Sequence, residues 1–562
     1  MSKQVANNEK RKLNINLAAL LMIVTPLILA GIVAIYHYLR NGGMSAVPGL
    51  MWNDEAAYYQ LIKTYTEYLS PAGYWGFNGN HAILGTGGAW SPAIIWPYVI
   101  FAHIFPLSKG FVYFVNLFYI TLANLIFYFC VKPDTKQSIK LALAQAGSAV
   151  FILYLSVNMS EMFRYAIVIV LAGLLYQIYF RESPKLLKYV VTPLLIIGAT
   201  QVYIFFAFCV PIYIFGIMKQ SKLWKKLVVS VAALGVEALG SYYLLHLISS
   251  NYNIHKTERL LNAVKSMDIG GAIRAFLGMV KQGAGDVFRL WTYVYTNPLI
   301  PFHVLFALVL VLVALGIVIA FILKKKRKQI GNRIISENIK ETGNEADEKE
   351  KQEETLIKGQ PGKDIIIAII VIYSIALFFG MYMTLYSIDP FTFMRGTYIV
   401  VIFAMYLMAM MDGKWIYNGL LVLQAVSLFF LPVNMDYFMT GHYMSAEEYA
   451  EWEALEEEIA EIISVTDSED PWENTVAMYT MEPKAICAMP AGVGVNFIME
   501  DGILPEKAEY LFFSKIPASE QNSGWIVRDY ETFRKEFGGR LEAEYTAIYE
   551  DELYVLYRKI TE

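Results

Sequence analysis

The chain has 562 residues, of which 56% are hydrophobic, whereas soluble domains are about 45–50% apolar. The formal net charge is −4, and residues 433–562 hold 28 of the 50 acids but only 9 of the 46 basic residues, which argues against nucleic acid as a partner. The apolar excess lies in long runs such as 14–39 and 299–323, each able to cross a hydrocarbon core of about 30 Å. We therefore predict an α-helical polytopic membrane protein.

The N-terminus, residues 1–13, carries four cations and is predicted to be cytoplasmic by the positive-inside rule. The run 14–39 is longer than the apolar region of a signal peptide, which has about 7–15 residues, and no clear cleavage site follows it. We interpret it as a retained anchor. The first external loop, 40–109, follows it.

This loop contains MWNDEAAYYQ, in which Asp54 and Glu55 are adjacent and lie among the aromatic residues Trp52 and Tyr58. Two solvated loop acids are the simple interpretation. A carboxylate in a partly dry aromatic pocket is, however, suited to accept a proton. If DEAAYY begins a helix, the helix N-terminal amides favour an ionised Asp54.

The apolar stretch 92–107 is short for a span and contains two prolines, so we predict a helix on the outer surface. Runs 110–131 and 137–158 follow it. The lysine-bearing connection 132–140 between these two runs then lies inside, in agreement with the charge rule.

The remaining runs complete a prediction of about 11 transmembrane helices, with a transmembrane core at 14–323. An external loop spans 248–298, and the mixed-charge segment 324–363 is predicted to be a disordered cytoplasmic linker. The last spans fall in 364–432. The run 190–218 is too long for one span, and Gly198, Thr200 and Gln201 interrupt it, so we expect two short helices there.

The tail, 433–562, is predicted to be a small external acidic α/β domain that can fold alone. It begins with an acidic helical stretch and contains a second helix candidate, RDYETFRKEFG. The strand candidates are NTVAMYT, AICAMP, EYLFFSK, AEYTAIYE and ELYVLYRK.

Residues 14–432 resemble the GT-C superfamily of membrane glycosyltransferases, most closely the protein O-mannosyltransferase and aminoarabinose-transferase branch. The family's D-E-x-x-Y-like motif is matched by Asp54, Glu55 and Tyr58. Its second external loop is similar to SVNMSEMFRYA, where Glu161, with Asn158 nearby, takes the place of the acid that is often Asp. Further matches are the juxtamembrane Pro92, Trp96, Pro97 and Tyr98, and Arg395 with Tyr398 in FMRGTYIVV.

The resemblance implies an inverting transfer of a sugar from a polyprenyl-phosphate donor to a cell-envelope glycan, lipid or protein on the outer face. Asp54 would be the base, with Glu55 and Glu161 as further catalytic acids. Cations would bind the departing phosphate, although lipid-headgroup contact is an alternative role for those in loop 248–298. The phosphate-binding candidates are Arg164, Arg395, Lys256, Arg259 and Arg289, and the sugar or acceptor candidates are Trp52, Tyr58, His81 and Tyr398.

No metal motif or cofactor is predicted, because the histidines and the three cysteines show no ligand spacing. Two other functions stay open. A transporter or flippase of lipid-linked sugars would need ionisable groups inside the membrane, and Glu237 is the clear acid within a predicted span. A non-catalytic cell-envelope assembly protein is the other alternative.

Overall fold

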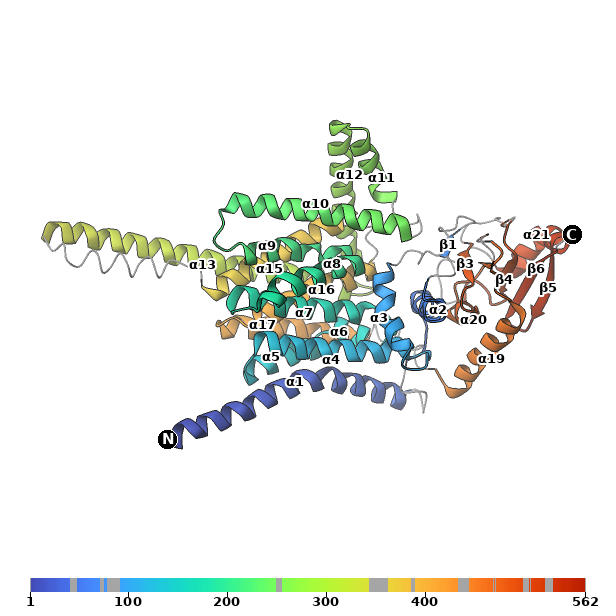
Figure 1. Cartoon of the computed structure of the whole chain (residues 1–562), viewed down its shortest axis with the longest axis horizontal. Coiled ribbons are helices and arrows are strands. Elements are labelled where there is room, and N and C mark those ends of the chain that lie inside the picture. The colour runs from blue at the N-terminus through green and yellow to red at the C-terminus, as the bar shows by residue number, and fades with distance from the viewer. Residues whose placement is uncertain are drawn as a thin grey trace.

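The apolar runs form long helices that lie side by side in a bundle in the computed structural model, with a sheet domain beyond one end (Figure 1). We call this end the site end. The structure describes residues 2–40, 48–70, 75–77, 91–248, 255–342, 362–385, 390–432, 444–467, 470, 472–498, 505, 507–520 and 529–560.

Five helices are long and apolar enough to cross a membrane, and a bent pair makes up to six. Apolar side chains such as Ile32 and Ile35 of α1 are exposed along the bundle flank, as expected for surfaces that face lipid. The protein is therefore a multi-pass membrane protein. The five are Leu17–Arg40 within α1 (Ser2–Arg40), α4 (Phe111–Val131), α7 (Glu161–Phe180), Leu299–Arg327 within α13 (Leu299–Thr342) and α15 (Lys363–Leu385), and the bent pair is α5 (Thr135–Ala146) with α6 (Ala149–Leu155).

Shorter apolar helices complete the bundle, and the count of 11 spans stays a prediction. The two short helices expected in 190–218 are present, but the break falls at Tyr203 rather than at 198–201. Thr200 does not interrupt the helix because its hydroxyl donates to the Ile197 carbonyl. The elements are η1 (Leu187–Val191) with α8 (Thr192–Val202), η2 (Ile204–Phe208) with α9 (Cys209–Ile217), α10 (Leu223–Ile248), α16 (Pro390–Met408), and α17 (Lys414–Ala425) with η5 (Val426–Phe430).

The prediction of a disordered linker from residue 324 is wrong for its first part, because α13 continues as a helix to Thr342. Helix-favouring Lys, Arg and Ile residues extend the apolar span without a Pro or Gly stop signal until Gly331. Residues 343–361 lie outside the described residues.

Two helices from the first loop lie across the site end of the bundle. They are α2 (Asn53–Tyr68) and α3 (Pro92–Ala102). In Figure 1, α3 runs across the direction of the long helices, and α2 lies between α3 and α20. This arrangement agrees with the predicted surface helix at 92–107. Its placement on the outer face stays a prediction.

The sheet has six strands in the order β1-β3-β2-β4-β6-β5. The edge strand β1 (Trp75–Phe77) comes from the first loop and pairs in parallel with β3 (Gly494–Phe497). The sheet is therefore not made by residues 433–562 alone. The other strands are β2 (Thr475–Met478), β4 (Tyr510–Ser514), β5 (Tyr545–Glu550) and β6 (Tyr554–Lys559), and the accompanying helices are α19 (Ala446–Ile462) and α21 (Tyr530–Glu544).

One predicted strand is wrong. AICAMP forms α20 (Pro483–Ala488), a short helix with proline in its first turn, where the missing amide proton costs nothing. A short apolar run does not by itself distinguish a buried strand from a buried helix. Four of the five strand candidates and both helix candidates are confirmed, whereas β3 was not predicted.

Candidate active site

Helix α2 places the opening acids, because its N-terminus starts at Asn53 as DEAAYY indicated. Trp52 is the N-cap residue, and Glu55 forms the return half of a capping box. The Glu55 Oε2 atom accepts from the backbone amides of Met51 at 2.8 Å and Trp52 at 3.0 Å. Asp54 is also in the first turn of α2. The helix dipole favours a negative charge at this position.

Glu55 is fully buried, and it connects α2 to the loop before α7. Its Oε1 atom accepts from the backbone amide of Asn158 at 2.7 Å. The Asn158 side-chain amide donates to the carbonyls of Pro48 at 3.0 Å and Gly49 at 2.6 Å. Both Glu55 oxygens thus accept backbone amides and hold α2 against the loop before α7. A catalytic partner of Asp54 would instead be expected to contact Asp54 or the substrate.

Two carboxylates and two guanidinium groups meet at the site end, contributed by α2, α7 and α16. Arg395 Nη1 lies 3.6 Å from Asp54 Oδ2 and 3.4 Å from Glu161 Oε1. Arg164 Nη1 donates to the same Glu161 oxygen at 3.2 Å. We call Asp54, Glu161, Arg164 and Arg395 the charge cluster. Its formal charge is balanced, which offsets part of the cost of placing ions beside an apolar bundle.

The cluster keeps open hydrogen-bonding capacity. Among the described residues, the buried atoms Glu161 Oε2, Arg164 Nε and Arg395 Nε have no hydrogen-bond partner. Asp54 is the most accessible member, with 30% of its side chain exposed, compared with 18% for Arg395 and 1% for Glu161. A substrate hydroxyl can therefore approach Asp54, and Arg395 can still bind an anion.

Burial raises the pKa of Asp54, and Glu161 raises it further, whereas Arg395 acts in the opposite direction. The net shift is upward from the ordinary value. A carboxyl group with a raised pKa binds a proton more strongly when ionised, which suits a general base.

Aromatic groups surround the cluster. The Tyr58 hydroxyl accepts from the Ser160 hydroxyl at 3.0 Å. The Arg164 guanidinium lies over the Tyr203 ring, 4.7 Å from the centroid, a favourable cation–π arrangement. Tyr203 lies at the break between α8 and η2, so this break places an aromatic ring against Arg164. Ser160 and Tyr203 were not predicted as site residues, although Ser160 lies within the SVNMSEMFRYA stretch.

Other predicted residues are distributed differently. Trp52 packs partly buried against the bundle core. Tyr398 is buried and lies edge-on to Tyr165 at 5.0 Å, and the Tyr165 hydroxyl donates to the Arg395 carbonyl at 3.0 Å. Tyr398 therefore packs in the bundle core and contacts the cluster only through Tyr165 in these interactions. His81 and the side chain of Lys256 lie outside the described residues.

Arg259 and Arg289 are exposed on two helices that extend away from the bundle flank, α11 (His255–Lys265) and α12 (Ile269–Arg289). Arg289 is 82% exposed and pairs with Asp286 at 3.7 Å. The structure does not bring either arginine to the charge cluster, because α12 packs on α15 and α11 packs on α12. Their role in binding the donor phosphate stays a prediction that this geometry does not support.

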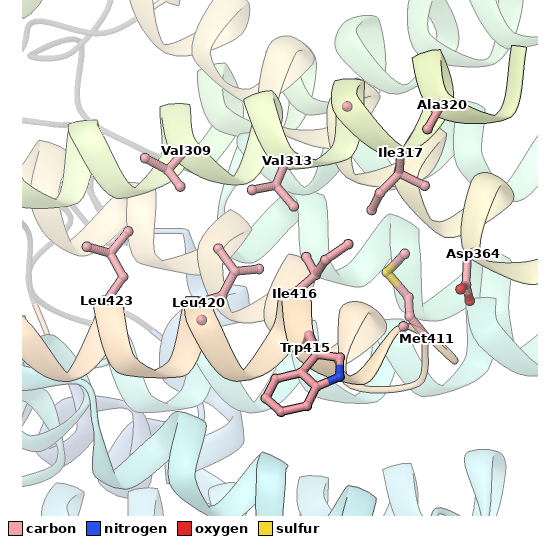
Figure 2. Close-up of a pocket in the computed structure, with 13 residues that line it drawn as sticks. Val309, Val313, Ile317, Ala320, Asp364, Met411, Trp415, Ile416, Leu420 and Leu423 are labelled. Carbon is pink, nitrogen blue, oxygen red and sulfur yellow. The ribbon is translucent and has the colours of Figure 1, made fainter. Parts of the chain in front are cut away.

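A separate groove of about 600 Å³ lies between α13 and α17 (Figure 2). Val309, Val313, Leu420 and Leu423 line one part of it, and Asp364 lies at its far end. Its lining is otherwise apolar or Gly, and none of the charge-cluster residues contributes to it. The groove is therefore distinct from the candidate site.

No protein-family model matches this chain, and no curated protein matches it. Two kinds of solved structure are similar to it. ArnT from Cupriavidus metallidurans bound to undecaprenyl phosphate is 10% identical, with a TM-score of 0.47, over 95% of this chain and 98% of that chain. The Archaeoglobus fulgidus oligosaccharyltransferase in the apo form is 12% identical, with a TM-score of 0.41, over 84% of this chain and 64% of that chain.

The same archaeal enzyme tethered to an acceptor peptide gives a TM-score of 0.40 at 10% identity, over 93% of this chain and 69% of that chain. Fold and site define a multi-pass helical membrane protein with a carboxylate and arginine site at one bundle end.

Proposed function

We propose that the protein is a glycosyltransferase that moves a sugar from a polyprenyl-phosphate carrier to a cell-envelope acceptor on the outer face of the membrane. The observation that carries the proposal is the charge cluster, in which Asp54 and Glu161 share the guanidinium group of Arg395. Acid–base and anion-binding groups are thereby joined at one end of a membrane bundle.

The chemistry follows from these groups. Asp54 accepts the proton of an acceptor hydroxyl, and the hydroxyl oxygen attacks the anomeric carbon from the side opposite the phosphate. The bond between that carbon and the phosphate oxygen breaks, and the configuration inverts. Negative charge develops on the departing lipid phosphate, where Arg395 and Arg164 stabilise it.

The position of the cluster supports a lipid-anchored donor. A site at the end of a bundle of apolar helices lies where the headgroup of a membrane lipid is found. The phosphate of such a lipid can reach the arginines, and its chain stays in the hydrocarbon region. The cell-envelope acceptor approaches from the side of the sheet domain.

Asp54→Asn tests the proposal. We expect turnover to fall by about 10²- to 10⁴-fold, the usual contribution of a general base, and binding of the donor lipid to be kept. The measurement is single-turnover transfer from a purified polyprenyl-phosphate sugar, with donor binding assayed separately.

Glu67→Gln is the matched control, because Glu67 is an exposed acid on the last turn of the same helix. Near-normal turnover in Asp54→Asn would remove Asp54 from the mechanism and leave Glu161 as the next carboxylate to replace. Loss of donor binding together with turnover would instead favour a transporter or a lipid-binding protein.

A further inference from the structure

The helices α11 and α12 form a hairpin whose outer face is apolar and uncovered. On α12, exposed fractions are 75% for Ile269, 55% for Ile273, 58% for Leu277 and 77% for Phe288. Met267, in the turn between the two helices, is 88% exposed. Such large apolar side chains gathered on one element mark a contact surface rather than a solvated one.

The exposed apolar residues of α12 lie on one side of the helix. At 100° per residue, Ile269, Ile273, Leu277 and Phe288 fall within an arc of about 100°. Arg274, Lys281 and Arg289 are exposed and occupy the adjoining arc. An apolar arc bordered by cations is the pattern of a helix that lies in a membrane interface, where long basic side chains reach the headgroups.

The hairpin is fixed at the level of the charge cluster. Gly283 of α12 packs so closely on α15 that an added Cβ would clash with the Met383 carbonyl oxygen. Met383 is in the last turn of α15, whose opposite end carries Lys363. The hairpin thus crosses α15 at the site end, near the start of α16 and Arg395.

Figure 1 shows α11 and α12 running across the direction of the bundle helices, beyond α10. A helix that lies across transmembrane helices near their ends runs along the membrane plane. The helix α10, on the flank of the bundle, likewise exposes apolar side chains: Val231, Val236 and Leu239 are 68%, 72% and 61% exposed.

We propose that the α11–α12 hairpin lies in the membrane interface at the site end, with its apolar arc among the acyl chains and Arg274, Lys281 and Arg289 on anionic phospholipid headgroups. This inference is independent of the proposed enzymatic function. Arg289 then binds phospholipid headgroups rather than the phosphate of the sugar donor.

The test uses the full-length protein, one chain per nanodisc, with Cys130, Cys209 and Cys487 replaced by Ala. An environment-sensitive fluorophore is attached in turn at Ile273→Cys, in the apolar arc, and at Gln282→Cys, an exposed position outside it. Spin-labelled lipids and aqueous iodide are the two quenchers. We expect lipid quenching at position 273 and iodide quenching there at least about threefold weaker than at 282.

The charge requirement is tested in the same discs. Raising the fraction of phosphatidylglycerol should weaken iodide quenching at position 273 further. This dependence on lipid charge should be lost in a triple variant that combines Arg274→Gln, Lys281→Gln and Arg289→Gln. Equal iodide access at 273 and 282 would overturn the proposal. Shielding from iodide without lipid quenching would assign the arc to a protein contact, and shielding that ignores lipid charge would overturn the anionic headgroup contact.

Discussion

At the scale of single residues, Arg395 is the link between the two carboxylates. Its Nη1 atom is within 3.6 Å of Asp54 and 3.4 Å of Glu161. A cation beside a carboxyl group favours the ionised form, so Arg395 sets how far burial can raise the pKa of Asp54. The same arginine can bind the departing phosphate, which couples base strength to donor binding.

The pH dependence follows from this contact. Because Asp54 acts when ionised and its pKa is raised, activity should increase as pH rises through that pKa. Arg395→Gln removes the opposing cation, so the pKa of Asp54 should rise further and the acidic limb should move to higher pH. The turnover that remains should also be about 10²- to 10³-fold lower.

The pH profile of kcat/KM measures this effect. Arg181→Gln is the control, since Arg181 is exposed at the opposite end of the helix that carries Glu161. If the acidic limb of the pH profile stays at the same pH in Arg395→Gln, Arg395 does not lower the pKa of Asp54.

Glu55 gives a contrasting prediction. Its two oxygens accept backbone amides on both sides, whereas a Gln side chain accepts at one oxygen only and turns its NH₂ group toward an amide donor. We expect Glu55→Gln to lower stability by about 1–3 kcal/mol. Thermal melting of the detergent-solubilised protein measures the loss, and unchanged melting with lost turnover would give Glu55 a chemical role instead.

At the scale of elements, α2 has two buried faces. Tyr58, Ile62 and Tyr65 pack into the bundle core, and Ala56 and Tyr59 pack into the core beneath the sheet. The helix that carries Asp54 is therefore held from both sides, and its position depends on the sheet domain as well as on the bundle.

A three-residue ionic contact secures the second face. Lys63 Nζ lies 2.5 Å from Glu456 Oε1, and Lys109 Nζ pairs with Glu456 Oε2. Lys109 is only 3% exposed and also donates to the Tyr59 hydroxyl at 3.2 Å. Burial acts to raise the pKa of Glu456, but the two ammonium groups outweigh it, and the pKa is lowered.

Glu456→Gln should therefore destabilise the contact between the sheet domain and α2, because it leaves the buried Lys109 charge without its carboxylate. The matched control is Glu451→Gln on the same helix, where Glu451 is 59% exposed and pairs with Lys484, a contact of little energetic value. The melting temperature and the turnover should both fall for Glu456→Gln and stay near normal for Glu451→Gln.

The stabilisation by the Glu456 ion pairs should depend on pH, because the pKa of Glu456 is lowered in the folded protein. A carboxylate whose folded-state pKa is lowered contributes stability above its unfolded pKa, and this contribution is lost as pH falls through the folded value. The stability gap between the parent protein and Glu456→Gln should accordingly narrow on acidification. A constant gap would contradict the ion-pair interpretation.

At the scale of the whole molecule, the bundle and the sheet domain are joined through the first loop. That loop supplies α2, which covers the core around Ile486, and β1, which pairs along β3. An isolated fragment 433–562 would expose both surfaces to water.

We expect the fragment 433–562 to bind a hydrophobic dye and to melt at a lower temperature than the same fragment with residues 48–77 fused to it by a flexible linker. Calorimetry and dye fluorescence measure the difference. Equal melting of the two forms would support the prediction that the tail folds alone, without a contribution from β1 and α2.

The sequence by itself determined the features that depend on local pattern. Apolar runs long enough to cross the bilayer predicted the spans. The DEAAYY stretch predicted the start of α2, with Asp54 in its first turn. Short runs of apolar and aromatic residues bounded by polar ones predicted β4 and β6. The side-chain periods of helices and strands are visible within about ten residues, so no distant contact was needed.

Only the tertiary structure decided which residues meet. Asp54, Glu161 and Arg395 come from three helices far apart in the chain, and their approach within hydrogen-bonding or ion-pair reach depends on how α2, α7 and α16 pack. The cations of loop 248–298 match Arg395 in chemistry, yet close packing at Gly283 holds Arg289 on the flank. Charge and residue type leave such choices open, because Coulomb energy depends on distances that packing sets.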